Sequence, residues 1–207
     1  MSTDDPSPTL ATGRRRPKGD KRQRTRAALL EAAREVVREK GYDATTLQDV
    51  AARAGMTSGA IYGNFKNRDD LFLALGLTYW PPILPRYRPA ATFAETMRAL
   101  AEATLAAIHE RRPVAGGRLT GMAYALGHEA MRARVEEITA ASYALGAEWV
   151  RSIADDDALP MPAEQLVCVI HVLTEGLVFQ RLLTPDLVPD EVFYAAFAAL
   201  ARAGREG

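Results

Sequence analysis

The chain has 207 residues, of which 48% are apolar and 25% charged, as expected for a soluble globular protein of one or two domains. Its 26 basic and 26 acidic residues balance, and no apolar run approaches the roughly 18 residues needed to span a bilayer. The start of the chain is polar and basic, and it lacks the apolar block of a secretion signal. These features favour a cytoplasmic protein that spans no membrane.

The charges are unevenly distributed along the chain. Residues 14–68 hold 14 Lys and Arg against six Asp and Glu, whereas residues 69–207 hold 12 against 18. Such a difference between segments indicates that the first part of the chain meets a polyanion, although a solvated basic face would give the same count.

Residues 1–20 contain three prolines and almost no large apolar side chains, so we expect a flexible basic arm there. A helix is predicted from Lys21 to Gly41 by apolar residues that recur on one face. Three shorter helices follow, and their expected N-caps are Thr46, then Thr57 or Ser58, then Asn67. The last of them ends at Trp80, because two prolines come next.

The rest of the chain predicts longer helices. Thr92 and Glu95 form a capping box before a helix that ends near residue 112. Helical patterns then cover residues 116–126, 128–153, 163–183 and 189–203, and no stretch alternates as a strand does. The sequence therefore predicts an all-α protein with a small first domain and a larger helical second domain.

A helix-turn-helix is predicted where two short helices meet at Gly55 within the basic segment. A recognition helix that approaches base edges must carry little on its outer face, and Ser58, Gly59 and Gly63 satisfy this. Side chains around this bare face can reach phosphate oxygens. They are Thr46, Thr57, Tyr62, Asn64 and Arg68. Simpler roles stay open for two of them, a helix cap for Thr46 and a contact between helices for Tyr62.

Through these residues, the segment 21–71 resembles the DNA-binding segment of the TetR family of bacterial transcriptional regulators. The resemblance rests on the spacing of Gly41, Tyr42, Thr45, Thr46, Val50, Ala51, Gly55, Ser58, Gly59, Ile61, Tyr62, Phe65, Lys66, Arg68 and Leu71. The resemblance implies base contacts from Ser58, Gly59 and Gly63. It implies phosphate contacts from Thr46, Thr57, Tyr62, Asn64 and Arg68. The family more often has a histidine at Gly63 or Asn64 and a lysine at Arg68.

Basic residues in the arm are further candidates for DNA contact, in the minor groove or along the phosphates. They are Arg14, Arg15, Arg16 and Lys18. A purely solubilising role for these residues stays open.

The resemblance also implies that the second domain binds a small-molecule effector and forms the homodimer interface through its last two helices. Helices 163–183 and 189–203 agree with this, because they carry more apolar positions than one core-facing stripe needs. Burial of both faces within one subunit remains the alternative. Candidates for the effector pocket are Trp80, Tyr87, His109, Tyr124, His128, Trp149, His171, Glu175 and Phe179.

No catalytic residues, cofactor or metal site are predicted. The three histidines lie far apart, and the chain has neither a phosphate-binding loop nor a nucleophile elbow. The single cysteine, Cys168, excludes a disulfide within the chain, and its apolar surroundings predict a buried side chain.

The resulting domain limits are 1–20 for the arm, 21–68 for the helix-turn-helix DNA-binding domain and 69–207 for the effector-binding and dimerisation domain. The expected function is a ligand-responsive regulator, a repressor that binds a palindromic DNA operator as a homodimer and is released by a small molecule. Three alternatives are an activator or global regulator without an inducer, a sequence-neutral architectural DNA-binding protein and a small helical enzyme.

Overall fold

The computed structural model describes residues 18–86, 90–155 and 158–202, and every regular element within these ranges is helical. The predicted all-α fold is confirmed. In chain order the helices are α1 (Lys18–Ala44), α2 (Leu47–Arg53), α3 (Ser58–Tyr62), α4 (Arg68–Tyr79), α5 (Phe93–Arg111), the 3-10 turn η1 (Arg112–Val114), α6 (Ala115–Gly127), α7 (Glu129–Ile153), α8 (Ala163–Leu183), the 3-10 turn η3 (Pro185–Leu187) and α9 (Asp190–Arg202).

Four helices begin at side-chain caps that the sequence predicted. In each case the cap oxygen accepts a hydrogen bond from the backbone N–H three residues later, which satisfies a donor that the helix itself leaves unpaired. These caps are Thr46, Thr57, Asn67 and Thr92. At Thr46 and Thr92 the acidic residue three positions on, Asp49 or Glu95, also accepts from the cap N–H and completes a capping box.

Two glycines shape the chain around the first helices. Gly41 has φ 79° and ψ 170° and interrupts α1, as the sequence predicted for its end. Gly55 has φ 64° in the turn between α2 and α3. A side chain is strained at both positions because positive φ brings Cβ against the following carbonyl.

A first hydrophobic core joins α1 to α4. Its largest buried side chains include Leu29, Val36, Ile61, Phe65 and Leu71. The same cluster includes Tyr124 of α6 and Met131 of α7, so the first four helices are fixed to the second domain by apolar contact. The predicted domain limit at residue 68 falls at the first residue of α4, whose apolar side belongs to this core.

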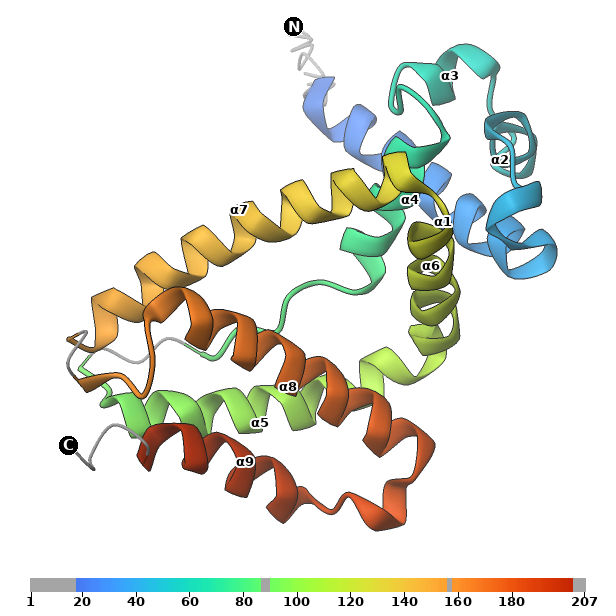
Figure 1. The fold of residues 1–207 in the computed structure, drawn as a ribbon. Helices are drawn as coiled ribbons and strands as arrows, with labels where there is room; N and C mark the ends of the chain where they lie inside the picture. Colours follow the sequence, from blue (N-terminus) through green and yellow to red (C-terminus); the bar gives the residue numbers. More distant parts are fainter. Residues whose placement is uncertain (1–17, 87–89, 156–157, 203–207) are drawn as a thin grey trace, which may run out of the picture.

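The second domain is built around α5, α8 and α9, with α7 crossing above them (Figure 1). Met97 and Leu100 of α5 pack against Phe193 and Phe197 of α9. A neighbouring cluster joins α7 to α8 through side chains that include Val150 and Leu166. Figure 1 shows α6 running from this layer to the first four helices.

The outer face of α8 corrects one prediction. Cys168 is exposed rather than buried, because α8 turns only one of its two apolar faces toward the rest of the chain. Val169 and Val172 beside it are also exposed. Among the described helices, α8 alone has the length and composition of a membrane-crossing segment, a property shared by apolar helices of soluble proteins.

Candidate functional site

The turn between α2 and α3 sets the geometry of the candidate DNA-binding surface. The backbone N–H of Gly55 donates to Ala52 and that of Met56 donates to Ala51, which closes the C-terminal end of α2. Thr57 then starts α3 within three residues. Figure 1 shows α2 and α3 at the end of the molecule opposite α9. Two short helices in this arrangement form a helix-turn-helix with α3 as the recognition helix.

The recognition helix has one packed side and one bare side. Ile61 and Phe65 are 0% and 1% exposed, and they hold α3 on the first core. The predicted base-contacting residues Ser58, Gly59 and Gly63 are all exposed. A backbone face with so little side chain allows close approach by a duplex.

Tyr62 is the largest side chain exposed on α3, with half of its surface accessible. Its hydroxyl accepts a hydrogen bond from Nε2 of Gln48 on α2 at 3.1 Å. This bond fixes the ring at the edge of the bare side and leaves the hydroxyl hydrogen available to a phosphate oxygen.

Thr46 lies at the exposed N-terminus of α2 and is held there by a polar network. Its Oγ1 accepts from the N–H of Asp49 and contacts the Asp49 carboxylate at 2.8 Å. The ammonium group of Lys40, followed by hydrogen bonds from Thr46, lowers the pKa of Asp49 from 3.8 to about 2. These contacts hold the cap in place, and a phosphate here would meet the helix N-terminus and Lys40, which is also paired with Asp49 at 2.8 Å.

The side-chain nitrogen of Asn64 is bonded to the end of its own helix, while its Oδ1 is buried without a hydrogen-bond partner. Its Nδ2 donates to the Ala60 carbonyl at 2.8 Å, and its backbone carbonyl accepts from Arg26 at 2.9 Å. The Arg26 guanidinium also lies 4.4 Å from the centre of the Phe65 ring. These contacts fasten the end of α3 to α1, which stabilises the position of the recognition helix.

Arg68 has partners in both domains. It donates to the Asp43 carbonyl and to the Tyr124 hydroxyl, each at 2.9 Å. The Tyr124 ring stacks on His128, with ring centres 3.9 Å apart, and His128 Nε2 lies 3.4 Å from the Asp43 carboxylate. Two residues predicted for the effector pocket, Tyr124 and His128, thus belong to the contact between the domains in this structure.

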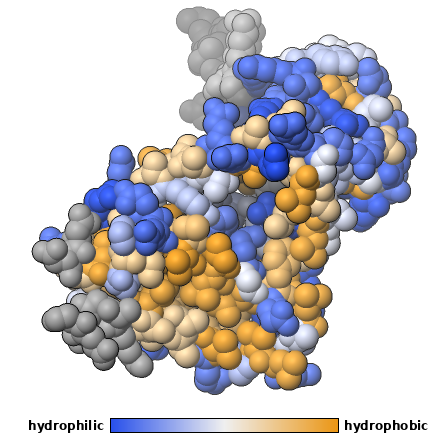
Figure 2. All heavy atoms as spheres, in the orientation of Figure 1, coloured by the Kyte–Doolittle hydropathy of each residue, from blue (hydrophilic) through white to orange (hydrophobic). Residues whose placement is uncertain are grey.

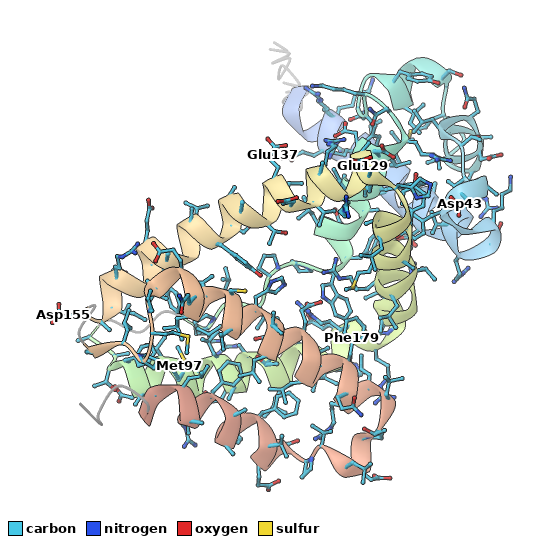
Figure 3. The ribbon with its side chains drawn as sticks, viewed as in Figure 1. Asp43, Met97, Glu129, Glu137, Asp155 and Phe179 are labelled. Atoms are coloured by element: carbon cyan, nitrogen blue, oxygen red, sulfur yellow. The ribbon has the colours of Figure 1, made fainter. Side chains whose placement is uncertain are left out.

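A cavity of about 560 Å³ lies between α4, α6, α7 and α8. Four predicted pocket residues line it: Trp80, Trp149, His171 and Glu175. Phe179 lies on the C-terminal half of α8 (Figure 3) and stacks on the Trp80 ring at 5.1 Å. His109 is exposed on α5 and is not among the lining residues.

Polar groups converge on Glu175 in the wall of this cavity. Glu175 accepts from Trp80 Nε1 at 2.6 Å, from Arg111 at 3.3 Å and from Arg118 at 3.4 Å. Burial lowers the pKa of Arg111, which is only 5% exposed, while Glu175 opposes that shift. The carboxylate therefore ties the end of α4 to α5, α6 and α8.

Sequence reasoning missed Tyr42, Arg111 and Arg118 as cavity residues. Arg111 carried a usable signal, because it lies seven residues after the buried Thr104 and eleven after Leu100, on the same face of α5. Tyr42 and Arg118 carried none, since their placement depends on how α1 meets α6.

The arm residues Arg14, Arg15 and Arg16 and the pocket candidate Tyr87 lie outside the described residues. Lys18 begins α1, and only its backbone is described. Figure 2 shows hydrophilic residues over much of the visible surface of the first four helices, and apolar residues gathered over the second domain.

A recognition helix with a bare outer side, carried on a small helical domain that packs against a larger one, defines a helix-turn-helix DNA-binding protein. Residues 29–75 match the family model for bacterial regulatory proteins of the tetR family. The predicted resemblance to TetR-type regulators is confirmed over this segment.

Known proteins resemble the chain in two different ways. The transcriptional regulator TtgR of Pseudomonas putida is 47% identical over 53 residues, which are 26% of this chain and 25% of TtgR. The chain thus spans about a quarter of the curated relatives it matches in sequence.

Solved structures match over more of the chain. The fold resembles NalD, described as the secondary repressor of the MexAB-OprM multidrug efflux pump in Pseudomonas aeruginosa, with a TM-score of 0.56, 23% identity and coverage of 89% of this chain and 99% of NalD. It also resembles SmeT in a complex with triclosan, with a TM-score of 0.54, 20% identity and coverage of 89% and 94%. These two likenesses concern the fold.

Proposed function

We propose that the protein is a cytoplasmic transcriptional repressor that binds a palindromic operator as a homodimer and releases it when a small molecule occupies the second domain. The observation that carries this proposal is the bare, exposed side of α3, backed by the buried Ile61 and Phe65. The TetR-type sequence match covers this same segment.

The phosphate and base contacts predicted from the sequence are part of the proposal. Ser58, Gly59 and Gly63 face the major groove, and Tyr62, Thr57 and Thr46 flank it at the phosphates. Arg68 and Asn64 already donate hydrogen bonds within the protein. They therefore contact DNA only through the N–H groups that these bonds leave unused. Specificity then depends partly on DNA shape, because few side chains project from the bare side.

The outer face of α8 supports a homodimer. Exposed apolar residues lie along α8, η3 and the start of α9, where one subunit alone provides no cover. They include Val169, Val172, Leu183, Leu187 and Val192. A second copy packed on this face would bury them and would set two recognition helices at a fixed spacing for two half-sites.

The cavity supports a small-molecule effector. Its volume falls within the range of ligand pockets, and its wall includes Trp80 at the end of α4 and Tyr42 of α1. A ligand would contact parts of the first core directly. The ligand would release the operator only to the extent that it binds the conformation without DNA more tightly than the DNA-bound conformation.

A mobility-shift assay against the DNA that flanks its own gene tests the proposal. We expect a specific complex that contains two subunits and weakens steeply as salt rises. A selection from fragmented genomic DNA that enriches no sequence would contradict the assignment. A selection that enriches asymmetric sites bound by one subunit would contradict the dimer.

A further inference from the structure

The wall of the cavity combines many apolar side chains with a few charged ones. Most of its wall is apolar and includes Leu73, Leu77, Met122, Leu126, Ile138 and Trp149. Among the described residues that line it, the charged ones are Arg111, Arg118, Arg132 and Glu175, so three positive charges face one negative charge. This composition favours a ligand with a large apolar body and an anionic group.

We infer that the effector is a mainly apolar molecule with one acidic group, and that Arg118 binds this group. The inference rests on the proposed effector function and names the ligand class and the residue that selects it.

Arg111 is not the group that meets the ligand. It donates to Glu175 and to the Pro81 carbonyl, and its side chain is almost fully covered. Its guanidinium carbon also lies 4.3 Å from the centre of the Trp80 ring. The charge of Arg111 is therefore matched by Glu175 and held in place by the Trp80 ring.

Arg118 has a side-chain hydrogen-bond donor that no acceptor in the protein satisfies. Arg118 donates to Glu175 at 3.4 Å, a long contact to a carboxylate already shared with Arg111 and Trp80, and its guanidinium carbon lies 6.0 Å from the centre of the Trp80 ring. Its Nε is buried and has no hydrogen-bond partner. A buried donor without an acceptor is costly, and a carboxylate or sulfonate oxygen placed there would satisfy the donor and offset one of the two surplus positive charges.

The position of Arg118 connects such a ligand to the first domain. Arg118 is close enough to Tyr42 for its charge to oppose the burial that raises the pKa of the Tyr42 phenol. Both residues line the cavity, and Tyr42 belongs to α1. An anionic group at Arg118 would therefore lie near a residue of the DNA-binding domain, whereas a neutral ligand would leave the Nε donor unpaired.

Two fluorescent dyes that share one aromatic body test this inference on the full-length protein. 8-Anilinonaphthalene-1-sulfonate carries a sulfonate, and N-phenyl-1-naphthylamine lacks it. We expect the sulfonate dye to bind once per subunit and about tenfold more tightly than the neutral dye. In Arg118→Met that preference should fall to about twofold or less, while binding of the neutral dye stays unchanged.

Two further variants separate charge, geometry and folding. Arg118→Lys keeps the charge but lacks the Nε donor, so it should retain part of the preference. Arg98→Met, at an exposed position on α5, should leave both dyes unaffected. Circular dichroism melting of each variant checks that the fold is intact.

The outcomes separate this inference from the proposed function. Equal binding of both dyes, or a preference that survives Arg118→Met, overturns the anion site but leaves the cavity as an effector site. If neither dye binds saturably, both the anion site and the role of the cavity as an effector site are overturned. If the sulfonate dye binds through Arg118 but operator DNA stays bound in a mobility-shift assay, the ligand class stands and the release step fails.

Discussion

The hydroxyl oxygen of Tyr42 lies where a side chain at Gly121 would have to go: a Cβ built on Gly121 would be 2.8 Å from it. The ring of Tyr42 also packs edge-on against Phe72 and stacks near Tyr124. Because Tyr42 comes from α1 and Gly121 from α6, this close approach is a tightly packed contact between the two domains.

Gly121→Ala should therefore destabilise the protein. Overpacking of a fitted contact costs about 1–3 kcal/mol, and each kcal/mol lowers Tm by roughly 2–4 °C for a chain of this size. Gly117→Ala in the same helix is the matched control, since a Cβ there meets nothing within 4 Å. It should be neutral or stabilise by up to about 1 kcal/mol. Tyr42→Phe removes the clashing oxygen and should restore part of the Tm of Gly121→Ala, as thermal melts would show.

Tyr62→Ala should weaken binding to operator and to random DNA alike, because it removes a phosphate contact. Ser58→Ala should instead relax preference at one base step, with random DNA bound as before. Competitive mobility-shift assays against single-base operator variants measure both effects. Equal losses on specific and random DNA for both variants would contradict the roles assigned to α3.

Val172→Asp should break the homodimer, because it places a charge on the exposed apolar face of α8. Sedimentation at micromolar concentration should show a dimer for the wild type and a monomer for the variant. Cys168, one turn earlier on α8, should react with a thiol reagent faster in the variant. Leu119→Asp on α6 is the control, and a monomeric wild type would overturn the prediction.

The Asp49 carboxylate should titrate at about pH 2, mainly because of Lys40. Its folded pKa lies below the ordinary 3.8, so its stabilising contribution is complete above pH 3.8 and is lost as pH falls to about 2. Carboxyl NMR titration checks the value, and Lys40→Met should move it back toward 3.8. An unchanged value in Lys40→Met would assign the shift to Thr46 alone.

Local features of this fold could be predicted from the sequence. The bounds of α8 agree with those predicted, and the caps Thr46, Asn67 and Thr92 were found by residue type and spacing. These signals lie within a few residues of the structure that they determine, so no knowledge of the tertiary fold is needed.

Features that depend on contacts between distant helices could not be predicted in this way. Nothing near Arg118 in the sequence indicates that it meets Glu175, which is 57 residues away. The pairing of Arg68 with Tyr124 is equally non-local, and it accounts for the position of Tyr124 between the domains. Cys168 looked like a core residue because an exposed apolar face of a helix has the same composition as one that faces the core.

The convergence of three donors on Glu175 has a consequence for how such sequences can diverge. A relative that lost this acid alone would keep Arg111 buried without a counter-ion, at a cost of several kcal/mol. Changes at this position should therefore occur together with changes at Arg111 or Trp80. An alignment of relatives that share the second domain should show these positions varying as a set, which would mark subgroups that bind different ligands.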